Sequence, residues 1–364
     1  MTYSRTHARS PYMAFAKLHS AAKYNLATSG IMPYPLAELP VRLEDLEING
    51  PTLYGFAPLK QRLAQRYGCR EENVVTAVGT SLANHLAMAA TFEPGEEVLL
   101  EEPTYELLLS TAEFLGANVR RFPRRATNQF AIDPADIRKA ITPRTRLVVI
   151  TNLHNPSSVL VGDDVLLEVG KIAASVGARV LVDEVYLEAL FEKRPKTALH
   201  LGENFLVTSS LTKAFGLSGL RCGWILAEGS LAERIWRIND LFGVNHAHPA
   251  ELMSVIALDA MDRVEARARA VLDANHTALR SLLAPRKDLE MVQPGVGTTV
   301  FPRLISGDVD RLDRFLRENY ETAVVPGRFF ERPNHFRVGL GGNPEMTLEA
   351  LNRLSDALDA FHSR

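Results

Sequence analysis

A lysine and an aspartate stand close behind two separate apolar runs of this chain. Lys213 follows the run 205–207, and Asp183 directly ends the run 180–182. An unprotonated lysine amine can condense with an aldehyde, and a carboxylate can keep a ring nitrogen protonated. A ring held in this way accepts electrons from the α-carbon of a bound substrate. The pair therefore indicates chemistry on a cyclic aldehyde cofactor, with Lys213 as the covalent anchor.

Residues around this pair are suited to binding a phosphate. Three of them open a predicted helix after an apolar run: Gly79, Thr80 and Ser81. The free N–H groups and the dipole of a helix start favour a dianion. Ser210 and Arg221 lie on either side of Lys213 in the sequence, and a planar guanidinium can bond two phosphate oxygens at once. We expect these five residues to form one phosphate site.

Taken together, four short motifs resemble the fold-type I enzymes that use pyridoxal 5'-phosphate (PLP), specifically the class I/II aminotransferases. The motifs are Gly-Thr-Ser at 79–81, Asn-Leu-His-Asn-Pro at 152–156, Asp-Glu-Val-Tyr at 183–186, and Ser-Leu-Thr-Lys at 210–213 followed by Arg221. The resemblance covers nearly the whole chain, and the order of the motifs makes the combination specific. It implies an aminotransferase that moves an α-amino group between an amino acid and a 2-oxo acid by a ping-pong mechanism.

The resemblance also implies roles around the cofactor ring. Lys213 would form the Schiff base and later move the α-proton of the substrate, while Asp183 would pair with the pyridine nitrogen. Tyr186 and Asn155 would donate hydrogen bonds to the phenolic oxygen of the cofactor. Tyr105 would lie over the ring and hold it flat.

Three residues far from these motifs complete the site that the resemblance implies. Arg337 would bind the substrate α-carboxylate through two hydrogen bonds, so the substrate would be an α-amino acid. The backbone at Gly30 would close over the same carboxylate, next to Asn155. Tyr54 would reach across an interface to the phosphate of a neighbouring subunit. A homodimer with shared active sites is therefore expected.

The chain departs from the pattern of this family at two places. Ser158 follows Asn-Pro-Ser where relatives usually carry a glycine, which leaves the path of that loop open. His246 and His248 fall where relatives often have small hydroxyl residues near the substrate entrance, so they could tune specificity. Two histidines can also suggest a metal, but no Cys, Asp or third His lies nearby in the sequence. We expect a packed or solvated pair and no metal site.

The hydrophobic pattern predicts an α/β fold with a mostly parallel sheet covered by helices. Apolar runs predict buried strands at 97–100, 147–150 and 179–182. Amphipathic stretches predict helices over 58–67, 79–91 and 164–177. The last hundred residues contain shorter strand patterns at 298–301 and 335–338 and a final helix over 347–361.

A chain of 364 residues is long for one hydrophobic core, so two domains are expected. We predict a large PLP-binding domain over residues 45–248. A smaller α+β domain would combine residues 1–44 with 249–364. One long helical stretch over about 249–283 would connect the two.

Composition limits the partners and the compartment. With 41 basic and 43 acidic residues, the net charge of -2 gives no electrostatic reason to expect nucleic acid or a membrane surface. Two cysteines are too few for a disulfide framework, so we expect a reducing cytoplasm. Residues 1–20 lack the apolar core of a signal peptide, and no apolar run is long enough to span a membrane. The partners expected are therefore small molecules.

Other functions remain open at this point. The same cofactor site serves lyases, decarboxylases, racemases and cyclising enzymes, because a fold does not settle a reaction. A ligand-sensing transcription factor on this fold would need a DNA-binding domain, and no helix-turn-helix pattern precedes it here. A nucleotide-binding enzyme is disfavoured because neither common glycine-rich phosphate motif occurs.

Overall fold

The computed structural model describes residues 6, 8–51, 53–292 and 295–362. The largest sheet within these residues has seven strands. The strands of this sheet are β2 (Val74–Val78), β3 (Glu97–Glu102), β4 (Asn118–Pro123), β5 (Thr145–Thr151), β6 (Arg179–Asp183), β7 (Phe205–Ser210) and β8 (Cys222–Leu226). Their order is β2-β8-β7-β6-β5-β3-β4. All neighbouring strands are parallel except that β8 runs antiparallel to β2 and β7. The mostly parallel α/β sheet predicted from the sequence is confirmed.

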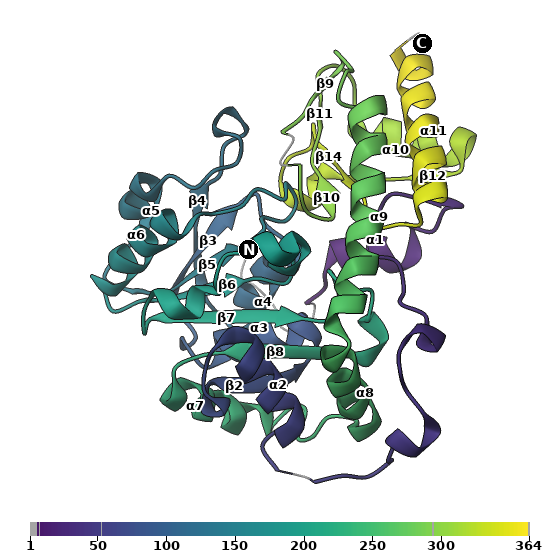
Figure 1. Cartoon of the computed structure of the whole chain (residues 1–364). Coiled ribbons are helices and arrows are strands. Elements are labelled where there is room, and N and C mark those ends of the chain that lie inside the picture. The colour runs from purple at the N-terminus through teal and green to yellow at the C-terminus, as the bar shows by residue number, and fades with distance from the viewer. Residues whose placement is uncertain (1–5, 7, 52, 293–294, 363–364) are drawn as a thin grey trace.

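Helices cover both faces of this sheet (Figure 1). They are α2 (Ala57–Tyr67), α3 (Gly79–Ala89), α4 (Glu106–Phe114), α5 (Pro134–Ala140), α6 (Asp163–Ala174) and α7 (Gly229–Asn239). Along β5, Leu147 and Val149 join the core that includes residues of α3, α4 and α7, while Val148 and Ile150 join the core that includes residues of α2, α5 and α6. A strand buried on both faces needs apolar residues at every position, which explains the continuous apolar runs.

The predicted helices over 58–67, 79–91 and 164–177 correspond to α2, α3 and α6. Helix α2 ends where Gly68 adopts a left-handed conformation with φ 64°, as a helix-terminating glycine does. Short 3-10 helices lie in the connections: η2 (Leu36–Glu38), η3 (Leu43–Asp45), η4 (Glu71–Asn73), η5 (Ala126–Asn128), η6 (Leu187–Lys193), η7 (Ala198–Leu201), η8 (Ser218–Leu220) and η9 (Gly327–Phe330).

The helical stretch expected over 249–283 is two helices, α8 (His248–Asp259) and α9 (Met261–Leu282). Ala260 separates them with φ -101° and ψ 20°, which is outside helical geometry. Figure 1 shows the two helices running from the large sheet toward the elements that contain the C-terminus. The helical stretch predicted from the sequence is thus present, with a break, and its role as a connector between two domains stays a prediction.

The remaining elements form a second group. They are α1 (Pro11–Leu18), β1 (Tyr24–Asn25), β9 (Leu289–Glu290), β10 (Thr299–Val300), β11 (Arg303–Leu304), α10 (Val309–Tyr320), β12 (Thr322–Ala323), β13 (Val325–Pro326), β14 (Phe336–Gly339) and α11 (Pro344–His362). Strand β1 pairs in parallel with β12, so the N-terminal segment joins the C-terminal part. The domain boundaries near 45 and 248 stay a prediction. Within the described residues, no helix is long and apolar enough to cross a membrane.

Candidate active site

Lys213 lies just beyond the carboxyl end of β7, on the wall of a cavity of about 400 Å³. Its Nζ donates a hydrogen bond of 3.1 Å to Ser29 Oγ, so an N-terminal residue meets the lysine across 184 positions of sequence. Nine other predicted site residues line the same cavity: Gly30, Thr80, Ser81, Tyr105, Asn155, Asp183, Tyr186, Ser210 and Arg221. The carboxyl ends of parallel strands are where open α/β sheets bind ligands.

Asp183 ends β6 and is 3% exposed. Its Oδ2 accepts a hydrogen bond of 2.8 Å from Asn84 Nδ2, and its Oδ1 accepts one of 3.1 Å from the backbone N–H of Val185. Burial raises the pKa of Asp183 to about 6, although these two hydrogen bonds act in the opposite direction. No salt bridge joins Asp183 to a basic side chain in the part of the chain that is described. A buried carboxylate in this state is suited to binding a cationic group.

Arg337 lies on β14 and is fully buried. Its Nη1 donates to Asn155 Oδ1 at 3.0 Å, and its Nη2 donates to the hydroxyl of Tyr12 at 2.8 Å and to the carbonyl of Ala27 at 3.2 Å. The Nε of Arg337 is buried and has no hydrogen-bond partner among the described residues. The structure thus places the arginine that was predicted to bind the carboxylate beside Asn155. Its positive charge is buried there, and its Nε donor is free to bind a ligand.

The residues expected to bind phosphate gather at the start of α3. Gly79 adopts φ 76°, and a Cβ on it would stand 2.3 Å from Arg221 Nη2, so another residue here would be strained and would displace the Arg221 guanidinium. Thr80 Oγ1 donates to Ser210 Oγ at 2.8 Å. Arg221 donates to the carbonyl of Val78 over a long 3.4 Å, and its other donors have no side-chain partner among the residues that the structure describes. Exposed donors and a helix start meet here, which is the arrangement that binds a dianion.

Two more predicted residues lie on the cavity wall near the N-terminal segment. Tyr105 precedes α4, and its ring packs edge-on against Tyr12 with centroids 5.6 Å apart. Burial raises the pKa of Tyr105 well above its ordinary value, so its hydroxyl stays protonated at neutral pH. Gly30 lies beside Lys213, where the N–H of Ile31 donates to the Lys213 carbonyl at 2.8 Å.

Three predicted residues, Gly79, Arg337 and Tyr54, are not among those that line the cavity. Gly79 and Arg337 contact residues that do line it, namely Arg221 and Asn155, whereas Tyr54 lies apart. Tyr54 is 43% exposed, and its hydroxyl donates to Asp240 Oδ2 at 3.0 Å and accepts from Arg237. A single chain therefore leaves Tyr54 away from its own Lys213. The role of Tyr54 in a neighbouring subunit stays a prediction.

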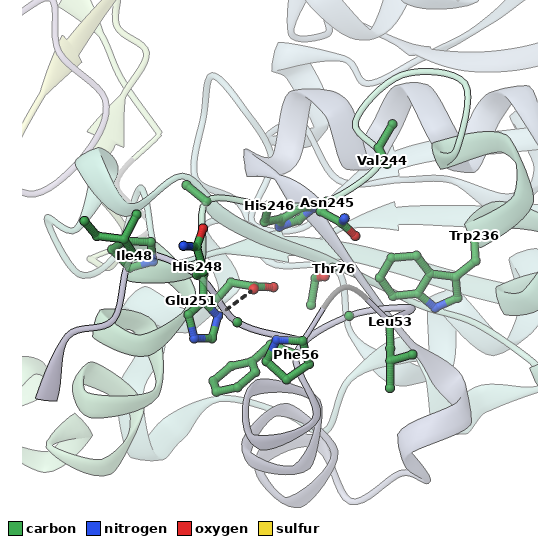
Figure 2. A pocket seen from close by; sticks show the side chains of 16 residues that line it. Ile48, Leu53, Phe56, Thr76, Trp236, Val244, Asn245, His246, His248 and Glu251 are labelled. Atoms are coloured by element: carbon green, nitrogen blue, oxygen red, sulfur yellow. Dashed lines mark ion pairs between the residues drawn. The ribbon is translucent and has the colours of Figure 1, made fainter.

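The two histidines of the 243–249 segment belong to a separate pocket of about 450 Å³ that shares no lining residue with the Lys213 cavity (Figure 2). His248 packs edge-on against Phe56, and its Nδ1 lies 3.8 Å from Glu251 Oε2. Burial lowers the pKa of His246, whose Nε2 has no partner among the described residues. The expectation of a packed pair fits this geometry.

Ser158 occupies the position where a glycine was expected, and it takes the glycine-like conformation with φ 59°. Its hydroxyl donates to the carbonyl of Thr299 at 2.7 Å. The loop path that the missing glycine left open is therefore the left-handed one, held by a hydrogen bond to β10.

Asn84 and Tyr12 were not predicted from the sequence. Asn84 is 4% exposed on a face of α3 that otherwise packs apolar residues against the sheet, and its Oδ1 accepts from Thr208 Oγ1 at 2.6 Å. A polar residue on an apolar helix face was the available signal for Asn84. Tyr12 offered no comparable signal, since its partner Arg337 lies 325 residues away.

Comparison with known proteins settles the family. Residues 47–354 match the model of the family described as aminotransferase class I and II. The chain belongs to this family. It is 31% identical to capreomycidine synthase of Streptomyces vinaceus over 334 residues, which cover 87% of this chain and 85% of that one. It is 25% identical to aspartate aminotransferase of Pyrococcus horikoshii over 79% of this chain and 76% of that one.

Solved structures agree with this assignment. A PLP-dependent aminotransferase from Streptococcus suis superimposes with a TM-score of 0.91 and 26% identity, covering 97% of this chain and 98% of that one. The PLP-dependent cyclase OrfR shares the fold with a TM-score of 0.85 and 24% identity, covering 97% of this chain and 96% of that one. The protein is thus a PLP-dependent enzyme of the aminotransferase type, a family that typically acts on amino acids and keto acids.

The residues of the Lys213 cavity fit PLP. The buried Asp183 carboxylate lacks a basic partner within the described ranges, as suits a group that binds a protonated ring nitrogen. At the other end of the site, Gly79 has no side chain, so the Arg221 guanidinium lies close to the backbone at the start of α3. The guanidinium and these backbone N–H groups are the donors that a phosphate needs. A lysine amine stands on the wall that joins the two ends.

Proposed function

We propose that this enzyme transfers an α-amino group between an amino acid and a 2-oxo acid by a ping-pong mechanism. One observation carries the proposal: a single cavity combines the Lys213 amine and the buried Asp183 carboxylate with Asn155, which accepts a hydrogen bond from Arg337. A free amine, a group that holds a ring nitrogen protonated, and an arginine for a carboxylate are what this reaction requires.

When bound, PLP supplies an electron sink for the α-carbon of the substrate. Lys213 would hold the cofactor covalently, and its Nζ, when free, would take the α-proton of the substrate and deliver it to the cofactor rather than back to the α-carbon. Asp183 would keep the ring nitrogen protonated, and Tyr186 and Asn155 would donate to the phenolic oxygen. Tyr105 would lie against the ring face.

The two ends of the site fix the position of the reacting atoms. Arg337 and the backbone at Gly30 bind the α-carboxylate, which orients the α-carbon hydrogen toward Lys213. The phosphate would be bound by the residues at the start of α3 and their neighbours: Gly79, Thr80, Ser81, Ser210 and Arg221. Binding at both ends turns the reaction into a local proton transfer between fixed groups.

The test is the half-reaction of the purified yellow protein with single amino acids and no keto acid. A reactive donor should convert the cofactor to its amine form and release the matching 2-oxo acid, and full turnover should give parallel initial-velocity lines. Borohydride reduction followed by peptide mapping should place the cofactor on Lys213. A label on another residue, or intersecting lines, would argue against the proposal.

A cyclase or lyase reaction in the same site is the second candidate. The relative that is 31% identical is a capreomycidine synthase, and the named cyclase OrfR shares the fold. The same half-reaction separates the candidates through its products. Pyruvate with ammonia would indicate a lyase, and an amino acid that loses water while keeping its nitrogen would indicate a cyclase.

We propose further that the enzyme acts as a homodimer in which Tyr54 contacts the phosphate of the neighbouring subunit. Tyr54 is exposed in the single chain, and so are Ile48, Leu53 and Val244, which line the pocket of Figure 2. Leu241 and Phe242 are also exposed, and they directly follow Asp240, to which Tyr54 donates a hydrogen bond. Burying such a patch against a second copy is favourable. Light scattering should give twice the chain mass, and Tyr54→Phe should weaken PLP binding. A monomer with full activity would contradict this.

The compartment that we propose is the cytoplasm. Cys69 and Cys222 are both free, and Cys222 is buried. Free buried thiols are typical of proteins kept in a reducing environment. Cell fractionation followed by immunoblotting checks the assignment, and recovery outside the cytoplasmic fraction would contradict it.

A further inference from the structure

Tyr12 belongs to the short helix α1, which the N-terminal segment places against the active-site cavity. Ser10 caps the helix by accepting from the N–H of Met13 at 3.0 Å, and Tyr12, in its first turn, is 6% exposed. The ring is fixed on two sides, by Tyr105 with centroids 5.6 Å apart and by Phe330 with centroids 5.9 Å apart. The Tyr12 side chain is therefore held in one place on the cavity wall.

The hydroxyl of Tyr12 has an unused hydrogen. Its oxygen accepts from Arg337 Nη2 at 2.8 Å, and no described residue accepts the phenolic hydrogen in return. A phenol can accept and donate at the same time. Since Arg337 Nη1 is bonded to Asn155, the Tyr12 hydroxyl and the partnerless Arg337 Nε are donors that remain for a ligand.

The charges around the hydroxyl favour an anion there. Burial alone would raise the pKa of Tyr12, but the positive charges of Arg337 and Lys213 lower it below its ordinary value. Tyr12 therefore lies in the positive field of both groups. Of the two ends of an amino acid, this field attracts the carboxylate.

We propose that Tyr12 is a substrate-binding residue whose hydroxyl donates a hydrogen bond to the carboxylate that Arg337 binds. The inference rests on the proposed function and adds a donor to it. Arg337 and Tyr12 would act as one unit, in which the arginine orients the phenol and the phenol completes the carboxylate site. Helix α1 would then be part of the substrate site as well as a cover for it.

The test is Tyr12→Phe in the full-length holoenzyme. The variant removes one oxygen and keeps the ring packed, and Arg337 Nη2 keeps its bond to the carbonyl of Ala27. A hydrogen bond to a charged group corresponds to about a 10-fold change in binding. KM should rise about 10-fold for the amino acid and for the keto acid alike, while kcat stays within about twofold, because the bond is equally strong in the ground and transition states.

Tyr24→Phe is the matched control. Tyr24 is also a buried tyrosine whose hydroxyl accepts from an arginine, Arg353, at 3.4 Å, but it lies outside the cavity. Inhibition by acetate, used as a plain carboxylate probe, should weaken about 10-fold in Tyr12→Phe and stay unchanged in Tyr24→Phe. Binding of PLP should be unchanged in both variants.

An unchanged KM and unchanged acetate inhibition in Tyr12→Phe would overturn the inference. An equal rise in KM and an equal loss of acetate inhibition in Tyr24→Phe would also overturn it, because such effects would reflect a general loosening of the fold. Arg337→Lys distinguishes this failure from failure of the proposed function. If that variant raises KM while Tyr12→Phe does not, only Tyr12 is excluded; if neither variant affects KM, the carboxylate site itself is misassigned.

Discussion

The raised pKa of Asp183 predicts that the cofactor-free enzyme is destabilised by its own active-site carboxylate. The pKa rises from an ordinary 3.8 to about 6 because the carboxyl is buried. A pKa change of one corresponds to about 1.4 kcal/mol, so the ionised carboxylate costs the folded state about 3 kcal/mol. The cost is absent below pH 4, where the group is protonated in both states, and complete above pH 6.

Asp183→Asn removes this charge with almost no change in shape. The free energy of unfolding of the variant, relative to the parent, should therefore increase by about 3 kcal/mol between pH 4 and pH 7. Loss of one of the hydrogen bonds from Asn84 or Val185 costs about 1 kcal/mol at every pH and shifts the whole curve without changing its shape. Adding PLP should favour the parent, because ligand binding stabilises the fold that binds it more tightly.

Urea unfolding of the cofactor-free proteins, followed by circular dichroism between pH 4 and pH 8, measures the difference. Asp356→Asn, at an exposed position on α11, controls for the removal of one negative charge. Burial raises the pKa of neighbouring Glu184 to about 8, so two carboxyl groups contribute to the pH dependence of the parent's stability. Glu184 is present in both proteins, and the difference between parent and variant therefore reports on Asp183. A difference that stays flat or falls with rising pH would refute the reasoning.

Three further changes test a buried ion pair, the loop at Ser158 and the phosphate site. Glu101→Gln leaves the fully buried charge of Arg124 without its partner and should lower the free energy of unfolding by about 3–5 kcal/mol in urea titrations; a loss below about 1 kcal/mol would contradict this. Ser158→Gly relieves the left-handed conformation but loses a hydrogen bond, so stability should stay within about 1 kcal/mol, whereas Ser158→Ala should cost about 1 kcal/mol. Gly79→Ala forces Arg221 aside and should weaken PLP binding at least about 10-fold in absorbance titrations; an unchanged affinity would contradict the phosphate assignment.

Much of this protein could be predicted from local sequence. Strands buried on both faces are continuous apolar runs, so β5 and β6 were recognisable, and residues that follow such runs must emerge at one edge of the sheet. Asp183 and Lys213 could be placed at that edge for this reason. The phosphate-binding start of α3 could be predicted because a glycine and two hydroxyl residues follow directly after β2.

Contacts between distant segments were decided only by the tertiary structure. Nothing local to residue 12 indicates that its hydroxyl meets Arg337, and nothing local to residue 84 indicates that its amide supports Asp183. The reversed direction of β8, the break at Ala260 and the left-handed Ser158 also depend on neighbours far along the chain. Apolar periodicity and turn chemistry act over a few residues, and so they fix elements and their ends. The partners of a buried polar group are fixed by packing, which only the folded chain specifies.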